Sequence, residues 1–262
     1  PFANTSHLSK FSVDVPLFLQ TSGNEVRTIL PKYGFVSERK YILREVIRLR
    51  EITFEFDGKD EIVSAKSAFI PKTRVQVYFL ENNEWFKPLS NLLYKAKNGR
   101  ILPDNDERYS YFSIASLATL PHLFWKPDVI ICNDWQNATV PMIYNQIYKS
   151  KEFYEDIKTV LIVHNIDEHC TYDRSIYDKL GIKLPNKIVG NKINCYEAAI
   201  EDVDLLISLD STSKNNTKKL LKLPLVKANK KKLVSMDIDD EENPNFDSTA
   251  SKINDELTKH FA

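Results

Sequence analysis

Short apolar runs closed by polar residues recur through the middle of the chain, and they predict strands buried on both faces of a parallel sheet. Residues 129–132, 159–163 and 205–209 are three such runs. Residues 140–148 follow the first run with apolar side chains at helical spacing, which predicts a helix. Because a strand, a polar turn and a helix make half of a βαβ unit, the pattern predicts an α/β fold: a Rossmann-like parallel sheet with flanking helices.

The rest of the pattern predicts a β excursion and several further helices. Residues 45–80 hold several short β-like runs and few helix signals, which predicts a small antiparallel excursion at about these residues. Asp104 and Glu107 resemble a capping box and predict a helix start. The remaining expected elements are helices at 8–20, 188–199, 211–221 and about 248–261, and strands at 25–30, 45–49, 52–56, 62–69, 75–80 and 233–235.

The order of these elements predicts one Rossmann-like domain over residues 1–262. A doubly wound sheet needs a strand before the helix at 8–20, and none stands there. We therefore expect the missing first strand as an apolar run before Pro1 in the parent chain.

Charge and composition exclude several classes of function. The chain has 36 basic and 36 acidic residues, so its net charge of zero argues against nucleic acid as the main partner. No apolar run is long enough to span a membrane. Its three cysteines form no CxxC pair, which indicates neither a disulfide framework nor a zinc site and favours a cytoplasmic setting. Only six glycines occur and no GxGxxG or GxxxxGK[ST] motif is present, so the usual phosphate loops are missing.

Polar residues stand directly after two of the predicted strands. Asn133, Asp134 and Trp135 follow the run at 129–132, and His164 and Asn165 follow the run at 159–163. In open parallel sheets, ligands bind outside the carboxyl ends of the strands. If these strands are parallel neighbours, an acid, an imidazole, an amide and an indole share one rim and could seat a sugar. The structural alternatives stay open, because an acid after a strand is often a helix N-cap.

Seven segments, in order, resemble the N-terminal half of bacterial glycogen and starch synthases. The similarity reaches about Lys222. The segments are PFANTSHL at Pro1, EVRTILPKYG at Glu25, VQVYFLENNEWF at Val75, DNDERYSYF at Asp104, WKPDVIICNDWQNATVP at Trp125, TVLIVHNI at Thr159 and INCYEAAIEDVDLLISL at Ile193.

The resemblance implies one half of a GT-B fold, in which two Rossmann-like domains face each other across a cleft. It implies glucosyl transfer from ADP-glucose to an α-1,4-glucan or maltooligosaccharide, with retention and without a metal or other cofactor. The site residues that it implies are Asp134 and His164 as catalytic, and Trp135, Asn165, Asn4 and Thr5 as substrate-binding.

The first loop departs from the family pattern. The family has lysine-threonine-glycine-glycine-leucine where this chain has Asn4 to Leu8, and aspartate where this chain has Lys10. The second Rossmann half, with its diphosphate-binding cations, does not follow Lys222. We therefore expect the chain to be incomplete or weakly active alone, with a second polypeptide or a homo-oligomer completing the cleft. A non-catalytic glucan-binding or regulatory relative is the alternative, and a structural partner without a ligand is a third.

Overall fold

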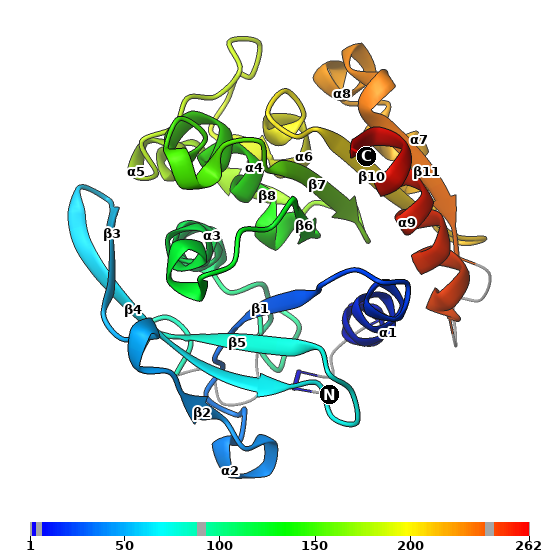
Figure 1. Cartoon of the computed structure of the whole chain (residues 1–262). Coiled ribbons are helices and arrows are strands. Elements are labelled where there is room, and N and C mark those ends of the chain that lie inside the picture. The colour runs from blue at the N-terminus through cyan, green and yellow to red at the C-terminus, as the bar shows by residue number, and fades with distance from the viewer. Residues whose placement is uncertain (1, 4–6, 88–92, 239–243, 262) are drawn as a thin grey trace. The chain divides into compact units, whose positions relative to one another are not determined.

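The computed structural model describes residues 2–3, 7–87, 93–238 and 244–261, and their strands form separate sheets (Figure 1). The chain divides into two units. The first comprises Pro1–Glu51, Val63–Leu93 and Met236–Ala262, and the second comprises Ile52–Ile62 and Tyr94–Ser235. The division into two compact units does not test the prediction of a single Rossmann-like domain over residues 1–262, which stays a prediction.

The sheet of the first unit is mixed. Strand β1 (Arg27–Pro31) runs parallel to β5 (Gln76–Glu81), and β5 is antiparallel to β4 (Lys59–Phe69). The short strand β2 (Arg44–Glu45) pairs with the other edge of β4. An antiparallel excursion is therefore present, but its predicted last run at 75–80 is the parallel partner of β1. The reason is that β4 runs antiparallel to β1, so that β5, which is antiparallel to β4, runs in the same direction as β1.

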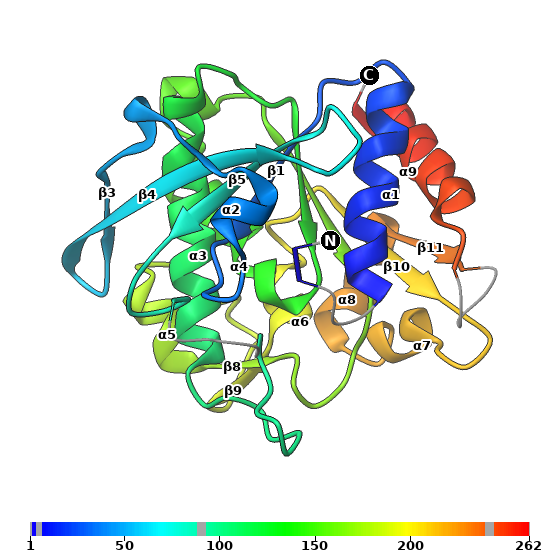
Figure 2. The same ribbon diagram turned by 90° about the horizontal axis from the view of Figure 1, so that it is seen from below.

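Two long helices of the first unit pack against each other, although they come from opposite ends of the chain. Helices α1 (His7–Thr21) and α9 (Phe246–Phe261) lie side by side in both views (Figures 1 and 2). The rings of Phe11 and Phe246 meet edge to face at 5.2 Å between centroids. The helices predicted at 8–20 and 248–261 are thus confirmed, and burial of their apolar stripes stabilises the pair.

The second unit contains a four-stranded sheet in the order β11-β10-β7-β6. Strand β7 runs parallel to both of its neighbours, with Cys132 opposite Leu161 on one side and Ile207 opposite Ile162 on the other. The central strands are almost wholly buried, as their unbroken apolar runs predict. The strands are β6 (Val129–Asn133), β7 (Lys158–Val163), β10 (Leu205–Asp210) and β11 (Leu233–Asp237).

Short helices and one small antiparallel strand pair complete the second unit, while residues 52–56 pair with β4 as the fifth strand of the mixed sheet. A two-residue turn at Asp57 and Gly58, both with positive φ, joins β3 (Ile52–Phe56) to β4. Across the ranges that the structure describes, no helix has both the length and the apolar character to cross a membrane. The other helices and strands are α2 (Glu38–Tyr41, in the first unit), α3 (Asn105–Thr119), α4 (Thr139–Ile143), a π-helix (Tyr144–Tyr148), β8 (Thr171–Asp173), α5 (Arg174–Lys179), β9 (Lys192–Asn194), α6 (Cys195–Ala199), α7 (Asn216–Leu220) and α8 (Pro224–Ala228).

Two predicted helices begin later than their apolar pattern indicates. Instead of one helix at 188–199, β9 pairs with β8 and α6 starts only after Asn194, whose side chain accepts hydrogen bonds from Tyr196 N and Glu197 N, both at 3.1 Å. The helix predicted at 211–221 begins after Asn215, which caps it through Lys218 N. In both cases an asparagine cap fixes the start, and periodicity alone missed it.

Two further local predictions are wrong. Residues 45–49 do not form a strand, because β2 ends at Glu45 and Ile47–Leu49 is a 3₁₀ turn. The capping box at Asp104 does not form, since the carboxylate of Asp104 pairs with Arg108 and that of Glu107 pairs with Lys179. Ion pairs formed by the folded chain displaced the local cap.

Candidate functional site

The ends of β6 and β7 meet at one edge of the sheet. Asn133, the last residue of β6, lies opposite Ile162 in β7. The backbone N–H of Asp134 continues the ladder and donates to the carbonyl of Ile162 at 2.8 Å. The sequence prediction that Asp134 and His164 share a rim is confirmed.

The backbone of Asp134 is strained. Its φ of 61° and ψ of −177° lie in a region that only glycine adopts freely. A non-glycine residue there costs about 1–3 kcal/mol and persists only where the surroundings hold it in place. Here the main chain is held on both sides, because the carbonyl of Asp134 also accepts from the N–H of Asn137 at 3.1 Å. Such strain concentrates at functional sites, so Asp134 is a candidate on backbone geometry as well as on position.

The carboxylate of Asp134 points into the protein. The residue is 8% exposed, and its Oδ1 accepts a hydrogen bond from the phenol of Tyr196 at 2.5 Å. The same oxygen lies 3.4 Å from the backbone N–H groups of His164 and Asn165. The carboxylate therefore ties the turn after β6 to the turn after β7 and to helix α6.

Burial sets the ionisation of Asp134. Loss of water around the carboxylate raises its pKa from 3.8 to about 6, although the hydrogen bonds from Tyr196 and from the N–H groups of Asn165, His164 and Trp135 oppose the rise. At neutral pH the group is mostly ionised, and just below pH 6 it is mostly protonated. Because this pKa lies close to neutral pH, a modest change in the surroundings of Asp134 would change the charge of its carboxyl group.

His164 presents a neutral ring at the same rim. Its Nε2 lies 3.1 Å from the side-chain oxygen of Asn133, so the proton is on Nε2 and donates to that amide oxygen. Burial lowers the pKa of His164 from 6.5 to about 3, which keeps the ring uncharged at neutral pH. The Asp134 carboxylate meets His164 through the backbone N–H rather than the ring. Asp134 thus anchors the backbone of the turn at His164, and Asn133 orients the neutral imidazole.

The other predicted site residues are engaged in protein contacts. Trp135 is 5% exposed and its indole meets the rings of Tyr94, Tyr109 and Tyr172 edge to face, at 5.5 to 6.1 Å between centroids. The side chain of Asn165 donates to Asp167. This geometry favours a packing role for Trp135 and a turn-fixing role for Asn165, and sugar binding by either stays a prediction. Asn4 and Thr5 lie outside the described residues.

Two polar residues near the rim were not predicted from the sequence. Tyr196, fully buried in α6, joins Asp134 to the carbonyl of Asn165. Asn216, at the start of α7, donates to the carbonyls of His164 at 3.2 Å and Leu209 at 2.7 Å. Neither directly follows a predicted strand, so their sequence signals were weak: Tyr196 lies in the family-like segment at Ile193, and Asn216 lies near a helix start. In the described part of the chain no three acidic, histidine or cysteine side chains gather to hold a metal ion.

A comparison with protein families matches residues 1–238 to the starch synthase catalytic domain. A glycogen synthase of Chlorobium limicola is 34% identical over 212 residues, which is 79% of this chain and 42% of the relative. A glycogen synthase of Chlorobaculum tepidum is 29% identical over 227 residues, covering 86% of this chain and 46% of that protein. The chain thus spans less than half the length of these relatives.

Among solved structures, the catalytic domain of starch synthase IV from Arabidopsis thaliana, bound to ADP and acarbose, has the same fold. The TM-score is 0.75 at 23% sequence identity, over 90% of this chain and 49% of that one. The expected α/β fold, with a parallel sheet and flanking helices as in one half of a GT-B enzyme, is confirmed.

Proposed function

We propose, because the chain belongs to the starch synthase catalytic domain family, that it takes part in glucosyl transfer from ADP-glucose to an α-1,4-glucan. The rim that carries Asp134 and His164 is its contribution to the site. The observation that supports this most directly is the strained backbone of Asp134 at the carboxyl end of a parallel strand, where ligands bind in such sheets.

The two residues have different parts in this proposal. His164 contacts the transferred glucose through a neutral imidazole, which Asn133 holds in one orientation. Asp134 acts as a positioning residue, since its carboxylate accepts from the N–H groups of His164 and Asn165. An ionised Asp134 therefore keeps the turn after β7 in place, and no metal or other cofactor is required from this half.

The test is incorporation of labelled glucose from ADP-glucose into a glucan primer. The chain is assayed alone and mixed with a separately produced C-terminal half of the Chlorobium limicola glycogen synthase. We expect incorporation in the mixture, and we expect His164→Ala to lower it by about a hundredfold or more, as loss of an oriented polar group at a reacting centre does. His169→Ala, in the same turn region, is the control. Equal rates for the two variants would remove His164 from the site.

Completion of the cleft by a second polypeptide or by a second copy of this chain is part of the same proposal. Sedimentation of the chain alone and in the mixture distinguishes these cases. A copy-completed site predicts a dimer with activity that rises with the concentration of the chain, whereas a partner-completed site predicts a monomer that is active only in the mixture.

A non-catalytic glucan-binding or regulatory relative is the second candidate, and Lys10 favours it. The family has an aspartate at this position, but here the ammonium of Lys10 donates to the carbonyl of Pro244 at 2.6 Å and so ties α1 to the segment before α9. Residue 10 therefore has a structural role in this chain, in place of the family's aspartate. Under this reading a maltooligosaccharide binds in a calorimetric titration while the mixture incorporates no glucose.

A further inference from the structure

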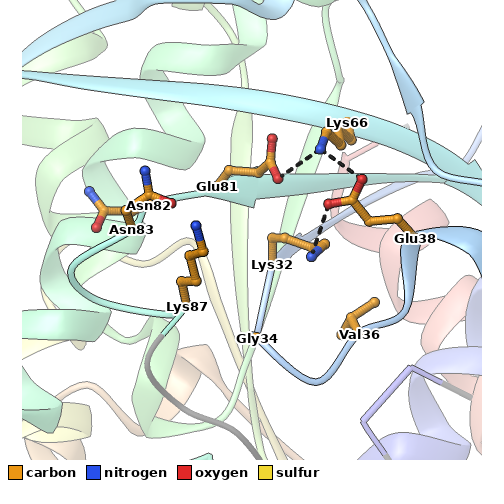
Figure 3. Close-up of a pocket in the computed structure, with 9 residues that line it drawn as sticks. All are labelled: Lys32, Gly34, Val36, Glu38, Lys66, Glu81, Asn82, Asn83 and Lys87. Carbon is orange, nitrogen blue, oxygen red and sulfur yellow. Dashed lines mark hydrogen bonds and ion pairs between the residues drawn. The ribbon is translucent and has the colours of Figure 1, made fainter.

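A polar cavity of about 400 Å³ opens in the first unit (Figure 3). This volume lies within the roughly 300–1,000 Å³ typical of small-molecule sites. Most of the side chains that line it are charged or carry amides. They are those of Lys32, Val36, Glu38, Lys66, Glu81, Asn82, Asn83 and Lys87, and Gly34 adds its backbone.

The cavity lies where the two parallel strands of this unit end. Lys32 directly follows β1, and Glu81 is the last residue of β5, with Asn82 and Asn83 after it. The carboxyl ends of parallel strands are the places where α/β sheets bind ligands. The backbone of Gly34 adds a stretch of wall without a side chain.

Four of the charged groups form one chain of ion pairs. The ammonium of Lys66 lies 2.9 Å from Glu38 and 3.2 Å from Glu81, and that of Lys32 lies 3.5 Å from Glu38. Figure 3 shows this chain as dashed lines. Only 12% of the side chain of Lys32 and 16% of that of Lys66 is exposed, so the protein holds both amines at the wall.

The ion pairs favour the charged forms of Lys66 and Glu38. Burial alone would lower the pKa of Lys66, but its hydrogen bond to Glu38 and the charge of Glu81 outweigh burial and raise the pKa. The hydrogen bond from Lys66 lowers the pKa of Glu38. Both shifts favour the charged forms of Lys66 and Glu38, and the two carboxylates of the ion-pair chain offset its two ammonium groups.

With Lys87, the lining of the cavity has three lysines and two glutamates, and therefore one positive charge in excess. Its amine points into the same space (Figure 3), and no ion pair to it exists within the ranges that the structure describes. Among the described residues, one carboxylate, that of Glu38, lies within ion-pair distance of Lys32, at 3.5 Å, although an ammonium has three donors. Two amines can therefore donate to an anionic ligand, while Glu38 and Glu81 accept from hydroxyl groups.

We propose that this cavity binds a hexose monophosphate, with the phosphate at Lys87 and Lys32 and the sugar hydroxyls at the carboxylates and amides. Inorganic phosphate alone fits less well, because it offers few donors to the two carboxylates. A neutral hexose fits less well, because it leaves the excess positive charge without a counter-ion. The site does not depend on the proposed glucosyl transfer.

Binding is tested by NMR titration of the backbone amides of Gly34 and Asn83 with glucose 6-phosphate, inorganic phosphate and glucose. We expect saturable shifts with glucose 6-phosphate at a lower concentration than with either of the other two. An absence of saturable shifts up to about 10 mM, where even a complex of millimolar Kd is well populated, overturns the proposal. Equal affinity for inorganic phosphate or for glucose also overturns it.

Matched lysine variants test the role of the excess charge. Lys87→Gln should weaken binding of glucose 6-phosphate about tenfold or more, which corresponds to about 1.4 kcal/mol. Lys252→Gln, which removes an exposed charge from α9 in the same unit, should leave the affinity unchanged. Both lysines are exposed, so thermal unfolding should confirm that the variants fold. Equal affinities for the two variants would rule out phosphate binding at Lys87.

Discussion

The phenol of Tyr196 lies 2.5 Å from the carboxylate oxygen Oδ1 of Asp134. The same phenol oxygen is 2.8 Å from the carbonyl of Asn165. A hydroxyl has one proton to donate, so it cannot satisfy both acceptors at once. While Asp134 is ionised, the phenol donates to its carboxylate and does not donate fully to the carbonyl of Asn165. The charge of Asp134 is therefore linked to the contacts of the turn after β7.

The first prediction concerns Tyr196→Phe. The hydrogen bond from the phenol stabilises the ionised carboxylate, so its loss should raise the pKa of Asp134 above about 6. It should also lower the free energy of unfolding by about 1.5–3 kcal/mol at neutral pH, as loss of a buried hydrogen bond to a charged group does. The pKa is measured from the carboxyl carbon signal of Asp134 by NMR, and the stability by urea unfolding.

Tyr177→Phe is the matched control for that change. Tyr177 is also fully buried, but in the described part of the chain its hydroxyl has no hydrogen-bond partner. Its removal should leave the free energy of unfolding unchanged or raise it by about 1 kcal/mol, since a buried unpaired polar group is costly. If both variants lose the same stability, the link between Tyr196 and Asp134 is wrong. This outcome leaves the glucosyl transfer proposal untouched, because neither measurement uses activity.

The second prediction concerns pH. The pKa of Asp134 is raised in the folded state, so its contribution to stability falls as pH rises from about 4 to about 6. The pKa of His164 is lowered to about 3, so its contribution rises over the same range, because the unfolded state binds the extra proton. Each slope is about 1.4 kcal/mol per pH unit, and the two slopes oppose each other.

Single variants separate the two slopes. The free energy of unfolding of Asp134→Asn minus that of the parent chain should increase by about 1.4 kcal/mol per pH unit between about pH 4 and 6. His164→Gln should give a difference of the opposite sign. Urea unfolding at several pH values measures both, and other titrating groups cancel in the subtraction. A difference that does not change with pH for Asp134→Asn would mean that this carboxyl has its ordinary pKa in the folded chain.

The third prediction concerns the indole of Trp135. Because three tyrosine rings pack around it, Trp135→Ala should lower the free energy of unfolding by about 3–5 kcal/mol, as truncation of a buried aromatic does. Trp125→Ala, at a half-buried tryptophan, should cost clearly less. Denaturant unfolding compares the two. A loss below about 1 kcal/mol for Trp135→Ala would contradict the packing role and favour the sugar-binding prediction.

The fourth prediction restores the family's aspartate at position 10. Lys10→Asp removes the hydrogen bond to Pro244 and places a like charge one helical turn before Asp14, whose pKa burial already raises. The change should destabilise the packing of α1 on α9 by about 1–2 kcal/mol. Hydrogen exchange of the α9 amides should then be faster. Lys10→Met separates loss of the bond from charge reversal, and unchanged α9 exchange in both variants would contradict the tether.

The amino-acid pattern alone was enough to predict the elements whose stability depends on burial. The runs at 129–132, 159–163 and 205–209 are apolar on both faces, and a buried parallel strand is the stable place for such a run. A parallel order of these strands also predicts that Asp134 and His164 lie at one rim. The start of α6, by contrast, depended on the side chain of Asn194 and on pairing between β8 and β9, which periodicity does not contain.

The contacts of the rim residues, in contrast, depend on how distant segments of the chain pack together. Tyr196 follows Asp134 by 62 positions, and no spacing rule links a helix hydroxyl to a carboxylate at that distance along the chain. Tertiary packing is also the origin of the glycine-like backbone of Asp134. It likewise raises the pKa of Asp134 and lowers that of His164. Local propensity is a property of neighbours in sequence, whereas strain, desolvation and long-range hydrogen bonds arise only when distant segments pack together and exclude water.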